Sequence, residues 1–156
     1  MPANHLMRRM RLPDMDRNEL LALTNQGYDC AQCVMKAFEK ELGEELGEAI
    51  RLVSCMSMGL LQGSVCGGVL AALAVIGWKF GKDQPDYAAQ GLCMIKREQF
   101  FMEFRQKYPD ITCPGILGLD VRKNEDNIRA NKEGLYTTLC PQMFEDIVAI
   151  VKKLLA

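Results

Sequence analysis

The sequence predicts an all-α protein, a single-domain bundle of five or six helices. Two observations support this class: apolar residues recur at helical spacing along most of the chain, and no run alternates between apolar and polar residues as a half-buried strand would. Asp, Ser or Pro precedes many of the apolar stretches and Gly follows several, which marks helix boundaries. We expect residues 1–15 to form a flexible N-terminal tail and residues 16–156 to form one helical domain.

The first part of the chain predicts three helices. Asp16 with Glu19 and Asp29 with Gln32 are capping-box pairs, in which two side chains satisfy the free N–H groups at a helix start. The helix that follows the second pair is expected to continue until a glycine ends it. A third helix is expected to begin near Glu44, because an acidic side chain suits the positive end of the helix dipole.

The second part begins with a Gly-rich loop over residues 59–63. Ser64 then precedes a helix that is apolar on nearly all sides, as the central helix of a bundle would be. A long helix starts at Pro85 and stops at Pro109, since proline suits a first turn and cannot continue a helix. Residues 120–134 are polar and lack apolar periodicity, so we expect mostly loop before the C-terminal helix.

Composition excludes several classes of protein. The net charge of −1 provides no basic field for nucleic acid. No charge falls between Arg51 and Lys79, but serines, a glutamine and glycines interrupt this stretch, so we expect no membrane span. The basic N-terminus lacks the apolar segment of a secretory signal, and the seven cysteines are too few for a disulfide scaffold. We therefore expect a soluble, cytoplasmic protein.

Four of the cysteines fall at predicted helix starts. Cys30 and Cys66 each lie in a predicted first turn, and Cys113 and Cys140 each precede a proline, which predicts an N-cap position. The N–H groups and the dipole at a helix start can lower the pKa of a thiol by roughly one unit. Thiolate is both a nucleophile and a metal ligand, although four thiolates in one place would repel one another.

The remaining candidates carry weaker signals. Cys30 and Cys33 form a Cys-x-x-Cys pair, but the βαβ pattern of a thioredoxin is absent. Cys55 and Cys93 lie within predicted helices, where cysteine packs as a small apolar residue. The single histidine, His5, lies in the predicted tail, so a Cys-His or Ser-His-Asp site is not expected.

The arrangement of cysteines resembles the C_GCAxxG_C_C family of putative redox-active proteins. The stretch Asp29-Cys30-Ala31-Gln32 is similar to the first family motif, and residues 63–71, Gly-Ser-Val-Cys-Gly-Gly-Val-Leu-Ala, are similar to the second. Cys113 and Cys140 match the two later single cysteines. Two positions depart from the pattern: Gly68 replaces the family's Ala, and Ala71 replaces its second Gly.

The resemblance and the helix-start positions together predict one pocket formed by Cys30, Cys66, Cys113 and Cys140. The first hypothesis is a thiol oxidoreductase, in which two of these cysteines cycle between dithiol and disulfide. The alternative is a metal site, with the same four residues binding Zn or an Fe–S cluster. A second alternative is a helical interaction protein whose cysteines only pack. The partner is an unknown redox partner or small molecule, and the sequence leaves a homodimer open.

Overall fold

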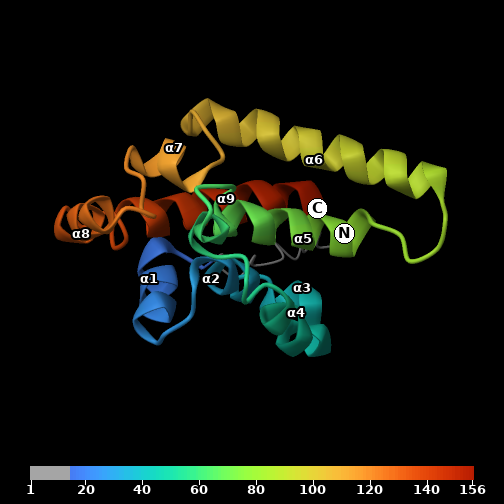
Figure 1. Cartoon of the computed structure of the whole chain (residues 1–156). Coiled ribbons are helices and arrows are strands. Elements are labelled where there is room, and N and C mark those ends of the chain that lie inside the picture. The colour runs from blue at the N-terminus through green and yellow to red at the C-terminus, as the bar shows by residue number, and fades with distance from the viewer. Residues whose placement is uncertain (1–14) are drawn as a thin grey trace, which may run out of the picture.

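A computed structural model describes residues 15–156, which are predominantly helical (Figure 1). This range contains no β-strand, and a single isolated antiparallel bridge joins Val65 to Thr112. The predicted all-α class is therefore confirmed. The helices are more numerous than the five or six predicted, because one predicted helix is divided and another was missed. The tail predicted for residues 1–15 lies, apart from Met15, outside the described residues, as does His5.

The helices follow one another in this order: α1 (Arg17–Asn25), α2 (Cys30–Lys36), α3 (Glu39–Leu42), η1 (Gly43–Glu45), α4 (Leu46–Leu52), η2 (Met58–Leu61), α5 (Gly67–Phe80), α6 (Tyr87–Lys107), α7 (Cys113–Leu117), α8 (Asn124–Lys132) and α9 (Leu139–Leu155). The label η marks short 3₁₀ helices. Both predicted capping boxes are formed: Asp16 pairs with Glu19 at the start of α1, and Asp29 pairs with Gln32 at the start of α2.

Two boundaries differ from the prediction. The helix expected to continue from Asp29 to the following glycine is divided at Phe38, whose φ and ψ of −104° and 23° are not helical. Phe38 is fully buried, so the break places a large side chain in the core. The third predicted helix begins as the 3₁₀ turn η1 and becomes α-helical at Leu46.

Residues 120–134, predicted as mostly loop, contain the nine-residue helix α8. Ala130 is its buried residue, so the sequence of α8 lacks the apolar stripe that identifies most helices. Its stability comes partly from charge: acidic residues occupy its first turn and basic residues its last turn, which complements the helix dipole. These residues are Glu125, Asp126, Arg129 and Lys132.

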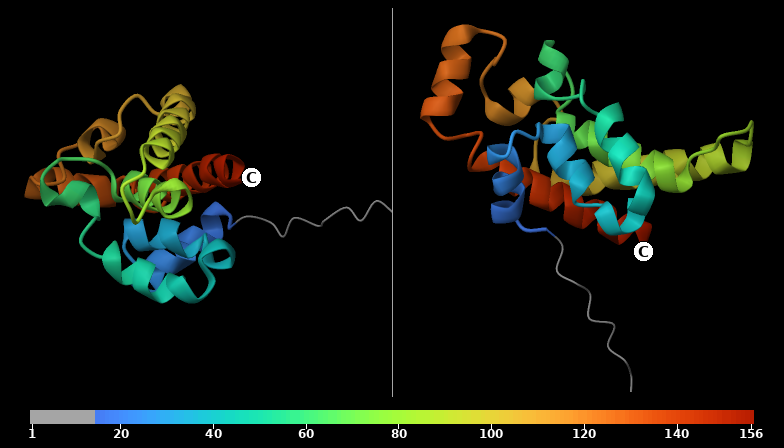
Figure 2. Two further views of the ribbon diagram at one scale, coloured as in Figure 1. Left: turned by 90° about the vertical axis from the view of Figure 1, so that its right-hand side faces the viewer. Right: turned by 90° about the horizontal axis from the view of Figure 1, so that it is seen from below.

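The longer helices pack in layers. Helices α5 and α9 lie side by side in the middle, with α6 across one side and α1 to α4 on the other (Figures 1 and 2). Helix α5 packs against α2, α6 and α9, which is the central position predicted for it. Half of its 14 residues are buried. Because α5 and α9 begin at the same end of the molecule as α7 and η2, several helix N-termini meet there (Figure 1).

The fold has two apolar clusters. The larger is built from α1, α2, α5, α6 and α9, and the smaller joins Leu117, Leu119, Val121 and Ala130. Cys140 packs against both clusters. The two clusters therefore meet beside the cysteines.

Two surface features relate to the predictions of no membrane span and of a homodimer. Within residues 15–156, no helix combines the length and the apolar character that a membrane crossing requires. On α6, the side chains of Leu92, Ile95 and Met102 are exposed. The homodimer is not tested by these observations and stays a prediction.

Candidate functional site: a cavity lined by four cysteines

The four cysteines predicted to converge line one cavity. The cavity has a volume of about 340 Å³, and Cys30, Cys66, Cys113 and Cys140 all contribute to its wall. All four are free thiols. Cys66 is buried, whereas the other three are half-buried. The rest of the wall is formed by Thr24, Tyr28, Asp29, Ser57, Met58, Ile116, Leu117, Tyr136, Met143 and Phe144.

Each of these cysteines lies at a helix start, although three of the exact positions differ from the prediction. Cys30 is the first residue of α2, as expected. Cys66 is itself the N-cap of α5, a position that had been assigned to Ser64. Cys113 is the first residue of α7, because Thr112 is the N-cap and accepts the Gly115 N–H.

Cys140 was also predicted as an N-cap and is instead the second residue of α9. The turn before α9 explains the difference: the N–H of Cys140 donates to the carbonyl oxygen of Leu135 at 3.1 Å, so the chain already coils before the proline. Pro141 then occupies the first turn, where its missing N–H costs no helical hydrogen bond.

A short backbone pairing fixes Cys66 relative to Cys113. The N–H of Cys66 donates to the carbonyl oxygen of Ile111 at 2.8 Å, and the N–H of Cys113 donates to that of Ser64 at 3.0 Å. The antiparallel bridge between Val65 and Thr112 lies between these two bonds. Two helix starts that are far apart in sequence are thereby held together.

Glycines allow the backbone to approach Cys30 and Cys113. A Cβ atom on Gly67 would lie 2.6 Å from Cys30 Sγ, and one on Gly59 would lie 2.9 Å from the Cβ of Cys113. Neither distance is possible for a real side chain, so both positions require glycine. Glycine at these two positions therefore permits close packing around the cysteines.

The family's Ala is replaced by Gly68 for a related reason. A Cβ atom on Gly68 would lie 3.0 Å from two ring atoms of Phe144. The Phe144 ring, which lines the cavity, would have to shift by a few tenths of an ångström to accommodate an alanine methyl group.

The loop predicted at residues 59–63 contains a strained left-handed turn, which the sequence did not reveal. Met58, Leu60 and Leu61 have φ values of 52°, 59° and 52°. Each non-glycine residue in this conformation costs about 1–2 kcal/mol. The turn, η2, also places the N–H of Met58 3.3 Å from Cys30 Sγ, to which it donates. Strain in η2 is therefore stored next to a candidate reactive sulfur.

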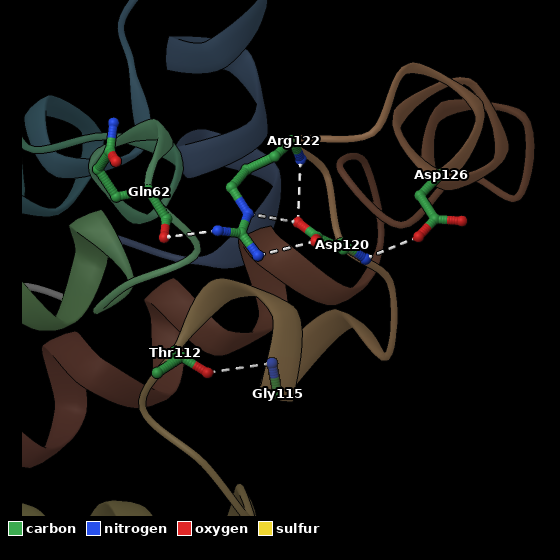
Figure 3. Close-up of polar contacts among 6 residues, drawn as sticks. All are labelled: Gln62, Thr112, Gly115, Asp120, Arg122 and Asp126. Carbon is green, nitrogen blue, oxygen red and sulfur yellow. Dashed lines mark hydrogen bonds and ion pairs between the residues drawn. The ribbon is translucent and has the colours of Figure 1, made fainter.

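Arg122 ties this loop to the segment that follows α7 (Figure 3). Its Nε and Nη2 atoms donate to the Asp120 carboxylate at 2.8 and 2.9 Å, and its Nη1 donates to the Gln62 carbonyl oxygen at 3.2 Å. The hydrogen bonds from Arg122 lower the pKa of Asp120. Residues 120–134 do not line the cavity; through Arg122 they are bonded to the chain at the end of η2.

Burial raises the pKa of all four thiols, which contradicts the expected lowering at helix starts. The pKa rises to about 11 for Cys30 and to about 12 for Cys140. For Cys66, burial raises the pKa well above the usual range, and the nearby Gly68 and Val69 N–H groups offset only part of this. Removal of a thiolate from water therefore outweighs the attraction of the helix N-terminus.

Cys113 differs from the other three. Burial alone raises its pKa, whereas negative charge on Cys113 adds to the effect of burial at Cys30, Cys66 and Cys140. A thiolate at Cys113 would therefore disfavour ionisation of the three neighbouring thiols.

The charges of the wall are few. Within the part of the chain that the structure describes, Asp29 is the one charged side chain of the lining, and no Lys, Arg or His lines the cavity. The Asp29 carboxylate accepts the N–H of Gln32 at 3.0 Å as part of the α2 cap.

The metal alternative has no preformed ligand group. Among residues 15–156, no three His, Cys, Asp or Glu side chains are grouped so that they could hold a metal ion. The four cysteines line one cavity, but among residues 15–156 they do not form such a group.

The other three cysteines lie outside the cavity wall. Cys33 is buried, and its Sγ donates to the Tyr28 carbonyl oxygen at 3.7 Å. Cys93 is half-buried and packs against the main core. Cys55 was expected in a helical core but is exposed, because α4 ends at Leu52 and the chain turns there.

Sequence reasoning missed the aromatic and methionine side chains of the wall. Tyr28, Tyr136, Met143 and Phe144 all line the cavity. Met143 and Phe144 carried a signal, because they follow Cys140 on the same helix; Tyr136 carried none, since it lies in a turn between helices.

Comparison with known proteins agrees with this arrangement. Residues 28–154 match the family described as "Putative redox-active protein (C_GCAxxG_C_C)". No curated protein and no solved structure matches the chain. The match begins just before Cys30, ends within the last helix and includes all four cavity cysteines, so the chain belongs to the C_GCAxxG_C_C family of putative redox-active proteins.

Proposed function

We propose that the protein is a thiol oxidoreductase in which two of the four cavity cysteines cycle between dithiol and disulfide. The observation that carries this proposal is the lining of one cavity by Cys30, Cys66, Cys113 and Cys140, each of them a free thiol at a helix start. The redox-active description of the family supports the same class of chemistry. The metal-binding alternative has less support, since the described residues hold no preformed ligand group.

Cys113 is the proposed attacking residue. Burial alone raises the pKa of its thiol, whereas a thiolate at Cys113 also raises the pKa of Cys30, Cys66 and Cys140. Its thiolate attacks the oxidant, and a second cavity thiol then displaces the reduced product and closes a disulfide. The two cysteines together give up two electrons and two protons, which the oxidant accepts.

Cys30 and Cys140 are the proposed second residues. Both are half-buried and both lie close enough to Cys113 for its charge to raise their pKa. Cys66 is only 3% exposed, so its sulfur is the least accessible of the four. Its proposed role is to help shape the cavity at the start of α5.

A redox titration with thiol counting tests the proposal. The protein is purified without oxygen and equilibrated with mixtures of reduced and oxidised dithiothreitol, and free thiols are counted at each potential. We expect the loss of two thiols in one reversible two-electron step. Cys113→Ala should abolish the step, whereas Cys33→Ala should leave it unchanged. If all seven thiols persist under oxidising conditions, the cysteines only pack, as the interaction-protein alternative holds.

A further inference from the structure

The charge of the cavity wall restricts what can approach the cysteines. Among residues 15–156, those that line the cavity include one carboxylate, Asp29, and no cationic side chain. A thiolate formed at Cys113 would add a second negative charge. An anionic substrate would therefore meet like charge, and among the described lining residues it would find no cationic side chain; Lys36 lies behind the wall, with its Nζ 4.8 Å from the centre of the Tyr28 ring.

Arg122, which is bonded to the chain at the end of η2, does not supply a positive charge to the cavity. Arg122 is paired with Asp120 and with the Gln62 carbonyl oxygen, and it is not part of the lining. Its charge is therefore already balanced on the outer side of η2.

The wall is also apolar and the space is small. Apart from the cysteines, it consists largely of aromatic, methionine and aliphatic side chains, namely Tyr28, Met58, Ile116, Leu117, Met143 and Phe144. The Tyr136 hydroxyl already donates its proton to Asn127 at 2.6 Å, so it has no proton left to donate to a substrate. A volume of about 340 Å³ lies near the lower end of the range of small-molecule sites, roughly 300–1,000 Å³.

We propose that the redox substrate of this cavity is a small, uncharged, apolar two-electron acceptor, such as a quinone or a neutral organic disulfide. This inference rests on the proposed thiol/disulfide function and specifies its substrate. With a quinone, two cysteine thiols become a disulfide and the quinone takes up two electrons and two protons to become a hydroquinone. With a neutral disulfide, the same cysteines become a disulfide and the substrate is released as two thiols.

Three small disulfides of similar size test the charge requirement. Bis(2-hydroxyethyl) disulfide is neutral, dithiodiacetate carries two negative charges, and cystamine carries two positive charges. For each reagent, mass spectrometry of peptides measures two rates: formation of a disulfide among the cavity cysteines, and reaction with the exposed Cys55. The first rate is divided by the second. The same ratio measured in urea corrects for the intrinsic reactivity of each reagent.

We expect the corrected ratio for the neutral disulfide to exceed that of each charged one by about tenfold or more, since a buried unpaired charge is costly. Equal ratios would overturn the inference, and a preference for cystamine would assign a cationic substrate instead. A parallel reaction with duroquinone, whose ring carbons are all methylated and resist addition, shows whether the acceptor is a quinone as well as a disulfide. If none of these reagents forms a disulfide among the four cysteines, the proposed function itself fails.

A charge added to the wall provides a second test. Ile116 is half-buried and lines the cavity, so Ile116→Lys should raise the reactivity toward dithiodiacetate relative to the neutral disulfide. Leu52→Lys is the matched control, because Leu52 is 75% exposed and lies outside this wall. Circular dichroism establishes that each variant is folded. A folded Ile116→Lys protein with unchanged selectivity would contradict the proposal.

Discussion

The sulfur of Cys30 occupies the space that a side chain on Gly67 would need, since a Cβ atom at Gly67 would lie only 2.6 Å from Cys30 Sγ. The same Cβ would lie 2.5 Å from the carbonyl oxygen of Met56. The start of α5 is thus packed against both Cys30 and the chain that leads into η2. This contact explains why a glycine directly follows Cys66.

Replacement of that glycine should disturb the cavity. We expect Gly67→Ala to lower the free energy of unfolding by about 1–3 kcal/mol, because overpacking forces backbone and Cys30 to move apart. The matched control is Gly77→Ala in the same helix, where the added Cβ meets nothing within 4 Å. That change should raise stability by about 0.5–1 kcal/mol, since alanine is the better helix former. Urea denaturation measures both, and equal effects at the two positions would contradict the packing described here.

The stability of the protein should depend on alkaline pH through Cys30. Burial raises the pKa of this thiol from 9.0 to about 11. The folded state holds the proton more tightly than the unfolded chain, so the stabilisation is complete below about pH 9 and is lost as the pH rises toward about 11. Two pKa units correspond to at most about 2.7 kcal/mol.

Comparison with Cys30→Ala isolates this contribution, because lysines and tyrosines titrate in both proteins. We expect the free energy of unfolding, measured in urea across this pH range, to fall more steeply in the wild-type protein than in the variant. Parallel pH profiles would show that the Cys30 thiol is not held in its neutral form by burial.

The hydrogen bonds that join Arg122 to Asp120 and Gln62 should limit access to the cysteines. Loss of the Arg122 bonds in Arg122→Ala should increase the rate at which iodoacetamide modifies Cys30 and Cys113, by no more than about fivefold because exposed ion pairs are weak. Arg129→Ala is the control: Arg129 also forms an exposed ion pair, with Glu133, but within the region of α8 and without a bond to η2. A similar increase in both variants would indicate general loosening rather than release of η2.

The three cysteines outside the cavity should be individually dispensable. We expect Cys55→Ala to leave the redox titration unchanged, because Cys55 is exposed in a turn and does not line the cavity. Cys93→Ala should behave in the same way, with at most a small loss of stability from the packing of its half-buried side chain. Loss of the two-electron step in either variant would place the chemistry elsewhere.

Much of the fold could be predicted from sequence where local signals act alone. The capping boxes at Asp16 and Asp29 involve residues three apart, so both are readable and both are formed. Helix α8 could not be predicted from periodicity, because Ala130 is its buried residue; the charges at its two ends were the available signal. The break at Phe38 depends on tertiary packing of a fully buried ring, which has no local signature.

In the candidate site, too, local features could be predicted from the sequence, whereas features that depend on tertiary packing could not. The four cysteines could be identified because each falls at a helix start, a local property. The direction of their pKa shifts could not, since it depends on how much water the folded chain removes from the cavity, and burial outweighs the helix ends. The left-handed residues of η2 were equally hidden, because Met58, Leu60 and Leu61 rarely adopt positive φ and only the surrounding contacts hold them there.

The most direct test of the central claim is peptide mapping by mass spectrometry of the fully oxidised protein, with remaining thiols blocked under denaturing conditions. The account predicts one dominant disulfide, joining Cys113 to Cys30 or to Cys140, with Cys33, Cys55 and Cys93 recovered as blocked thiols. A map in which oxidation pairs cysteines outside the cavity, or links only separate chains, would contradict it.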